Sequence, residues 1–253
     1  KSKNYKYIYF FALSSGLLML TRGEFVLIFG LILFFVYFDK KINFINLIKI
    51  IVIVTLITSP YLIRNYVHFN QVVIVKSLGW NLWKGNNELS SIEGYENFEK
   101  FEFKNLKLKL DNLKKDKQYE IKRDKTFLKE AIRNLNENPT RYVGLFFKKV
   151  FSYYFVDLNS KYPNYYNFFH IFPIILISAL SFPGMFIFFK TNKFKQKYLG
   201  IYFFLNLIIF SIFFIVPRYK LIILPIQIIL AAYFIQYVFN KLNINIINEK
   251  NFK

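Results

Sequence analysis

The chain of 253 residues has no cysteine and only two histidines, His68 and His170. The lack of cysteine excludes disulfides and thiolate metal sites. The two histidines lie far apart, and neither has a partner at ligand spacing, so we expect no metal site. The sequence also lacks a glycine-rich phosphate loop, a nucleophile elbow and an HExxH motif. It therefore carries no familiar soluble-enzyme signature, and we expect no cofactor.

Acidic residues are scarce. The chain has 15 Asp and Glu against 35 Lys and Arg, which gives a formal net charge of +20. This charge favours anionic partners such as lipid head groups and phosphates. The basic residues lie in short loops beside apolar runs rather than on a separate basic domain, so nucleic acid is not an expected partner. A general compositional bias toward Lys, Asn, Ile, Phe and Tyr is an alternative origin of the charge.

Charge-free runs dominate what is present. The chain is 55% hydrophobic with a mean hydropathy of +0.28, although 20% of its residues are charged. This combination is typical of apolar spans that alternate with charged loops. A helix needs roughly 20 apolar residues to cross a bilayer core of ~30 Å. The runs that approach this length are 7–21, 25–38, 42–63, 165–189, 198–217 and 221–240.

These runs predict an all-α fold, a polytopic transmembrane helix bundle of about six spans. Short basic loops at 39–41 and 190–197 set the orientation, because such loops stay in the cytoplasm. Both ends of the chain then face the cytoplasm. The expected regions are transmembrane helices 1–3 in 1–64, an extracytoplasmic insertion in 65–164, transmembrane helices 4–6 in 165–241, and a cytoplasmic tail in 242–253.

The external region is expected to be mainly helical. Apolar residues recur at helical spacing over 115–138, and 141–156 forms a second amphipathic stretch that we expect to lie along the membrane surface. Residues 92–114 fit either a strand or a helix. Within the apolar runs, Pro60 is expected to break the third span near its end, and two further prolines predict kinks in the fourth.

Cations mark the expected external ends of the spans. Arg22 and Glu24 lie in the turn between the first two spans, Arg64 lies where the third span leaves the membrane, and Arg218 lies between the last two. Charges at this depth face a cavity or pair with each other, and an arginine can hold a phosphate through two parallel hydrogen bonds. The alternative is simple anchoring of helix ends at the interface.

Polar and aromatic residues accompany these cations. Asn65 follows Arg64, Trp83 and Asn86 lie shortly after the third span, and Tyr219 follows Arg218. A tryptophan ring can stack on a sugar, and an asparagine offers donors and acceptors that suit sugar hydroxyls. The alternative is a structural loop whose tryptophans pack on the helix expected over 115–138.

Four segments carry a resemblance to known sequences. Residues 16–24 resemble a "GLLxGLAxLTRPE" hairpin, and 60–66 with 81–87 resemble "PWxIRNY…NLWxGNN". Residues 130–155 resemble "EAxxxIxxNPxxYxxLxxKKxxxFW", and 218–225 resemble "RYRLPxxP". The departures are Gly23, Tyr61, Lys220 and Ile222. Together the segments resemble the C-terminal portion of GT-C glycosyltransferases, in the group of protein O-mannosyltransferases and lipid A aminoarabinose transferases.

The resemblance implies an integral membrane enzyme of a bacterial cytoplasmic membrane. Such an enzyme moves a sugar from a polyprenyl-phosphate donor to a hydroxyl of a glycan, lipid or protein acceptor on the extracytoplasmic face. The family's catalytic carboxylate lies in the first external loop, which this chain lacks. We expect the chain to be a fragment, because it begins with Lys1 and has no signal peptide. Because the loop with the catalytic carboxylate is missing, we expect this fragment to be inactive alone.

Other functional classes fit the same pattern. A lipid-linked polysaccharide polymerase or ligase is the nearest enzyme alternative. A transporter or flippase of lipid-linked sugars would also place arginines against phosphates, but it more often buries charges in mid-span, and the last three expected spans carry none. A membrane scaffold without catalysis is the remaining class.

Overall fold

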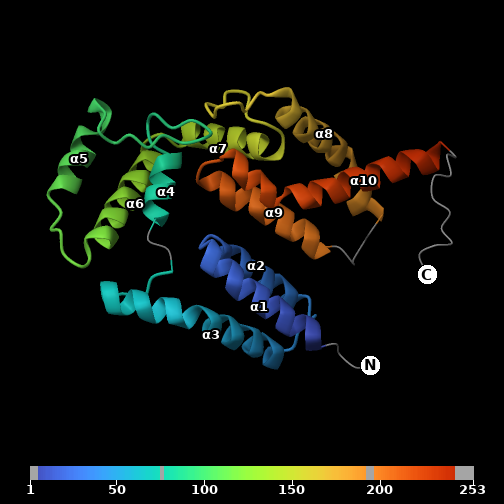
Figure 1. Cartoon of the computed structure of the whole chain (residues 1–253), viewed down its shortest axis with the longest axis horizontal. Coiled ribbons are helices and arrows are strands. Elements are labelled where there is room, and N and C mark those ends of the chain that lie inside the picture. Colours follow the sequence, from blue (N-terminus) through green and yellow to red (C-terminus); the bar gives the residue numbers. More distant parts are fainter. Residues whose placement is uncertain (1–4, 75–76, 192–196, 243–253) are drawn as a thin grey trace. The chain divides into compact units, whose positions relative to one another are not determined.

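The structure is a computed structural model that describes residues 5–74, 77–191 and 197–242 (Figure 1). These residues form helices and loops without a strand, so the all-α prediction is confirmed. The helices are α1 (Tyr5–Thr21), α2 (Phe25–Phe38), α3 (Phe44–Phe69), α4 (Leu78–Gly85), η1 (Phe101–Phe103), α5 (Lys104–Asp111), α6 (Tyr119–Glu137), α7 (Pro139–Tyr154), α8 (Phe168–Thr191), α9 (Lys197–Ile212), η2 (Pro217–Ile222) and α10 (Leu224–Lys241).

The chain divides into two compact units. The first consists of Lys1–Gly144 and Ile212–Phe214, and the second consists of Leu145–Ser211 and Ile215–Lys253. The short segment Ile212–Phe214 thus belongs to the first unit although it comes late in the sequence. Each unit is described by itself below.

Helices α1, α2 and α3 pack together in the first unit (Figure 1). The predicted hairpin is present, because α1 ends at Thr21 and α2 begins at Phe25. Gly16 lets α1 approach α3 closely, since a Cβ there would lie 2.9 Å from Cδ1 of Ile57. Helix α2 reverses the chain direction, so α1 and α3 run parallel. The turn after α1 therefore lies at the same end of this group as the C-terminal part of α3.

Pro60 does not break α3, contrary to the sequence prediction, and the helix continues to Phe69. A proline lacks the N–H that would donate to the carbonyl four residues earlier, here that of Leu56. The Ser59 hydroxyl donates to that same Leu56 oxygen at 2.9 Å. The neighbouring side chain thus supplies the missing donor, and the helix passes through the proline.

Two described helices, α3 and α8, are long and apolar enough to cross a membrane. At ~1.5 Å per residue their 26 and 24 residues extend roughly 39 and 36 Å. Only 22% of the apolar window of each is buried, whereas the core helix of a soluble protein is mostly buried. Helices α1, α2 and α9 are apolar but shorter. The structure supports two spans by length and composition, and the six-span arrangement is not confirmed.

Helix α9 ends at Ile212, earlier than the span expected over 198–217. Pro217 begins η2 and disfavours a helical conformation at the residue before it. Val216 accordingly has an extended backbone, with φ −117° and ψ 152°. The segment that belongs to the first unit consists of the last residue of α9 and the two residues that follow it.

The second unit is built around the contact between α8 and α10. The carbonyl of Tyr154, at the end of α7, accepts hydrogen bonds from Ser178 Oγ and from Gln227 Nε2, each at 2.9 Å. The Tyr154 hydroxyl also pairs with Ser181 Oγ at 2.8 Å. These buried polar contacts join α7 to both α8 and α10, and they fix the relative positions of the three helices.

Gly184 permits the close packing of α8 on α10, and its replacement tests this contact. A Cβ at Gly184 would lie 2.0 Å from the Leu230 carbonyl oxygen, a backbone atom that cannot move aside alone. We expect Gly184→Ala to lower the free energy of unfolding by about 1–3 kcal/mol, as overpacking does. Gly144→Ala is the control, because nothing lies within 4 Å of a Cβ there. Thermal unfolding in detergent compares the variants, and equal melting temperatures would contradict the packing.

Candidate functional site

The turn between α1 and α2 holds Arg22 and Glu24. The backbone amides of Phe25, Val26 and Leu27 donate to the carbonyls of residues 22–24, so a tight turn leads directly into α2. Glu24 stands at the N-cap of α2 without a side-chain cap hydrogen bond. Both charged side chains are half-buried.

Adjacent residues of α3 have opposite environments. The side chain of Arg64 is exposed and makes no hydrogen bond or ion pair within the described residues. Asn65 is fully buried, and its Nδ2 donates to the Val73 carbonyl at 2.7 Å. Asn65 therefore fastens the chain after α3 onto the helix. Because α1 and α3 run parallel, the turn that holds Arg22 and Glu24 lies at the same end of the α1–α3 group as the C-terminal part of α3, which carries Arg64.

Trp83, expected to stack on a sugar, is fully buried. Its ring centroid lies 5.1 Å from those of Phe103 and Phe127, and it belongs to a core with Leu106, Leu110 and Ala131. The structure thus favours the packing alternative, in which the tryptophans of α4 contact the amphipathic helix α6. The segment over 92–114, left open by the sequence, is helical at α5 and contributes to the same core.

Asn86, the other residue nominated in this segment, is also committed to the protein. Its Nδ2 donates to the carbonyls of Leu82 at 2.9 Å and Ile212 at 2.8 Å, and its own carbonyl accepts from Asn134 Nδ2 at 3.2 Å. Gly85 beside it allows contact with Phe213, whose carbonyl oxygen would lie 1.8 Å from a Cβ. The sequence pattern at 81–87 is explained by packing and backbone hydrogen bonds.

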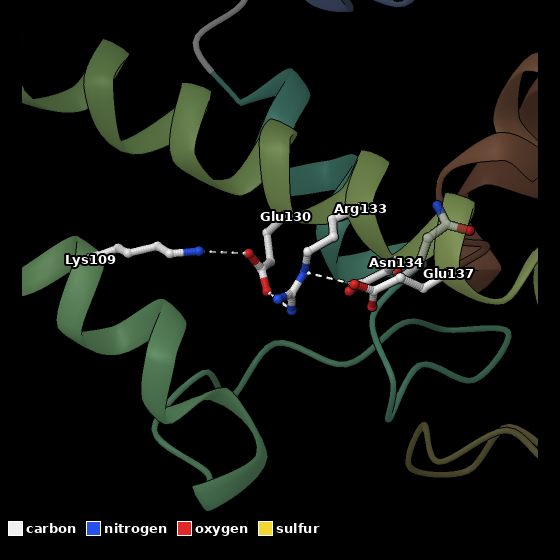
Figure 2. Close-up of polar contacts among 6 residues, drawn as sticks. Lys109, Glu130, Arg133, Asn134 and Glu137 are labelled. Carbon is white, nitrogen blue, oxygen red and sulfur yellow. Dashed lines mark hydrogen bonds and ion pairs between the residues drawn. The ribbon is translucent and has the colours of Figure 1, made fainter.

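A buried carboxylate on α6 was not nominated from the sequence (Figure 2). Glu130 forms ion pairs with Arg133 on the same helix and with Lys109 of α5, whose Nζ lies 3.4 Å from Oε2. Arg133 also reaches Glu137, with Nε 3.7 Å from Oε1. Glu130 is thus engaged by two cations that join α5 to α6, and this arrangement suits a structural role better than that of a general base.

A cavity of about 380 Å³ lies where α4 meets α6. Its lining combines aromatic and charged residues, which are Ser77, Trp80, Glu120, Arg123, Asp124 and Phe127. Four of these residues, 120, 123, 124 and 127, lie on one face of α6, and their helical spacing is visible in the sequence. Their contact with Trp80 depends on how α4 packs against α6, which the sequence does not show. A larger cavity of about 770 Å³ lies beside the turn between α2 and α3 and is lined partly by Lys40 and Lys41.

The second unit contains the remaining nominated residues, Arg218 and Tyr219, on η2. Arg218 is exposed, and the Tyr219 carbonyl accepts from the Tyr153 hydroxyl at 3.2 Å. The next residue, Lys220, is buried, and its Nζ has no hydrogen-bond partner within the described residues. From the sequence, Arg218 and Lys220 in this turn are two cations that could serve a phosphate pocket, with anchoring of helix ends as the alternative, and the structure adds that Lys220 is buried.

Burial lowers the pKa of two lysines in this unit. Desolvation lowers the pKa of Lys220 from its ordinary 10.5 to about 7, and it lowers the pKa of Lys149 on α7 to about 7. A buried ammonium is costly unless an anion accompanies it. On η2, Arg218 is exposed, whereas Lys220, two residues later, is buried.

Comparisons of the chain with protein-family models, with curated proteins and with solved structures found no match. The described residues also contain no group of three or more His, Asp or Glu side chains that could hold a metal ion. The case for a function therefore depends on the residues and their geometry.

Trp83 offers a direct test of the packing role. We expect Trp83→Ala to lower the free energy of unfolding by about 3–5 kcal/mol, because it empties a fully buried site. Trp83→Phe should be tolerated far better, since the indole Nε1 has no hydrogen-bond partner within the described residues. Chemical denaturation of both variants measures the difference. Similar stability of Trp83→Ala and the wild type would argue against the packing role.

The lowered pKa of Lys220 predicts a pH-dependent stability. Between about pH 7 and pH 10 the unfolded lysine binds more protons than the folded one, so stability rises with pH over this window. Below about pH 7 both states are protonated, and the penalty of the buried charge is complete. Lys220→Met should melt at a higher temperature near neutral pH and show a shallower rise. Lys241→Met, at an exposed site, is the control, and identical pH profiles for wild type and Lys220→Met would contradict the assignment.

Proposed function

We propose that this chain is part of a membrane glycosyltransferase that moves a sugar from a polyprenyl-phosphate donor to an acceptor hydroxyl. The observation that carries the proposal is that η2 holds two cations, an exposed Arg218 and a Lys220 that is buried without a hydrogen-bond partner in the described part of the chain. Cleavage of such a donor leaves a lipid phosphate, and fixed cations stabilise its charge.

Lys220 lies between two apolar helices, α9 and α10. A lysine in this position lowers the stability of the unliganded protein, and an anion beside it would offset that cost. Neighbouring Arg218 is exposed, and among the described residues its side chain makes a cation–π contact alone, with its guanidinium carbon 5.8 Å from the Tyr219 ring centroid. The planar guanidinium suits a phosphate that arrives from outside the unit.

The apolar helices provide for the lipid part of the donor. Helices α3 and α8 are long enough to cross a membrane and leave most of their apolar side chains unburied. A polyprenyl tail and the surrounding lipid acyl chains would cover such surfaces. The proposed topology has six spans in a bacterial cytoplasmic membrane, with 65–164 outside, so that Arg64 and Arg218 lie on the external face.

The acceptor hydroxyl needs a general base within hydrogen-bond reach. The proposal assigns this role to no residue of the chain, since Glu130 is engaged by two cations. The residues assigned here bind and orient the donor, with Arg218 and Lys220 as the principal contacts. Arg22, Glu24 and Arg64 form a second polar group at the end of the α1–α3 helices.

Binding of a polyprenyl monophosphate to the chain in zwitterionic nanodiscs tests the proposal. Removing one charge-assisted contact costs ~1.5–3 kcal/mol, so Arg218→Ala and Lys220→Met should each weaken binding roughly 10- to 150-fold. Arg218→Lys should restore only part of the affinity, because lysine lacks the planar fork. Lys241→Ala, at an exposed site, is the control.

The corresponding polyprenol, which lacks the phosphate, distinguishes charge recognition from tail binding. The polyprenol should bind the wild type weakly, and its affinity should be the same for Arg218→Ala and Lys220→Met. Lys220→Met is informative because it should weaken binding of the polyprenyl monophosphate while it stabilises the protein. A purely structural lysine does not give this combination. Unchanged affinity in both Arg218→Ala and Lys220→Met would refute the donor-binding role of η2.

A further inference from the structure

The cavity between α4 and α6 has the composition of a small-molecule site. Its volume of about 380 Å³ falls in the range of ligand pockets. Trp80 and Phe127 give it an apolar wall, and Glu120 and Arg123 bring charges of both signs. None of these residues is one of the two cations of η2, which belongs to the other unit.

Arg123 is the central polar group of the cavity. Its guanidinium carbon lies 5.6 Å from the ring centroid of Phe127 and 5.8 Å from those of Trp80 and Phe98. The guanidinium of Arg123 makes no hydrogen bond or ion pair within the described residues. The aromatic rings hold the guanidinium in place while its five N–H donors remain available. A ligand rich in oxygen acceptors would satisfy those donors.

Asp124 has a different role. Its Oδ1 accepts from the Trp80 amide at 2.8 Å and its Oδ2 from the Gly79 amide at 3.0 Å. Both carboxylate oxygens thus anchor the start of α4 to α6. Gly79 allows this approach, because a Cβ there would lie 2.0 Å from the Asp124 carbonyl oxygen. The backbone that carries Trp80 is therefore fixed relative to Arg123, and the cavity is formed before any ligand arrives.

We propose that this cavity binds one neutral sugar ring, with Trp80 against the ring and with Glu120 and Arg123 hydrogen-bonded to its hydroxyls. A neutral polyol fits because carboxylates and a guanidinium line the same small space, and a ligand with a full negative charge would meet both Glu120 and Asp124. A hydroxyl can donate to a carboxylate and accept from a guanidinium. Assigning the ring to the acceptor substrate rests on the proposed glycosyltransferase function.

Intrinsic fluorescence can report the binding, because Trp80 and Trp83 are the only tryptophans of the chain. In a Trp83→Phe background Trp80 is the sole reporter. The chain in nanodiscs is titrated with glucose, mannose, galactose and N-acetylglucosamine, and with glucuronate as the anionic counterpart. We expect a saturable change in emission with at least one neutral sugar and a weaker response to glucuronate.

Variants of the cavity lining test the assignment. Arg123→Ala and Glu120→Gln should each weaken sugar binding at least roughly 10-fold, as the loss of a hydrogen bond to a charged group does. Lys125→Ala, an exposed position of the same helix, is the matched control. Melting temperatures show that each variant is folded, and Glu120→Gln keeps the test valid if Arg123→Ala is unstable.

The outcomes are distinct from those of the donor test. No response to any neutral sugar, unchanged affinity in both folded variants, or tighter binding of glucuronate than of every neutral sugar would overturn the proposal. Binding of the polyprenyl monophosphate is measured on the same preparations. If the chain binds a neutral sugar but not the polyprenyl monophosphate, the donor role of η2 is rejected and the sugar cavity is retained. If it binds the polyprenyl monophosphate but no neutral sugar, the cavity proposal alone is rejected.

Discussion

The carboxamide of Asn86 is the interaction on which the packing of α4 in the first unit depends. Its Nδ2 satisfies carbonyls from α4 and from Ile212, while Asn134 of α6 donates to the Asn86 backbone. Buried carbonyls that lose their donor carry a full desolvation cost, so the side chain and backbone of Asn86 together join α4, α6 and Ile212. Because Gly85 admits the Phe213 carbonyl beside it, residues separated by about half of the chain pack against each other.

Much of the fold could be predicted from the spacing of charges and apolar residues. The gap at 22–24 predicted the α1–α2 hairpin, and helical periodicity predicted α6 and α7 with small errors at their ends. The passage of α3 through Pro60 could not be predicted in this way, because it depends on which acceptor the Ser59 hydroxyl selects. Pro217 is a sequence signal against a helix that continues to 217, but hydrophobicity alone suggested a longer α9.

The candidate site was less accessible to sequence reasoning. Asparagine and tryptophan serve equally well as ligand contacts and as internal packing, and the local pattern does not say which. Trp83 and Asn86 turn inward because α6 and residues 212–214 cover them, and those contacts arise only in the folded chain. Lys220 shows the opposite case: a charge stands where local rules favour an apolar residue, and such violations concentrate where proteins bind something.

The Ser59–Pro60 pair has a consequence for how α3 can move. The hydrogen bond that bridges the proline is made by a hydroxyl on a single rotatable bond, not by the backbone. Rotation about χ1 of Ser59 would free the Leu56 carbonyl without disturbing any other helical bond of α3. Prolines are common sites of helix kinks, so the regularity of α3 about one turn before Arg64 depends on a single side-chain torsion angle.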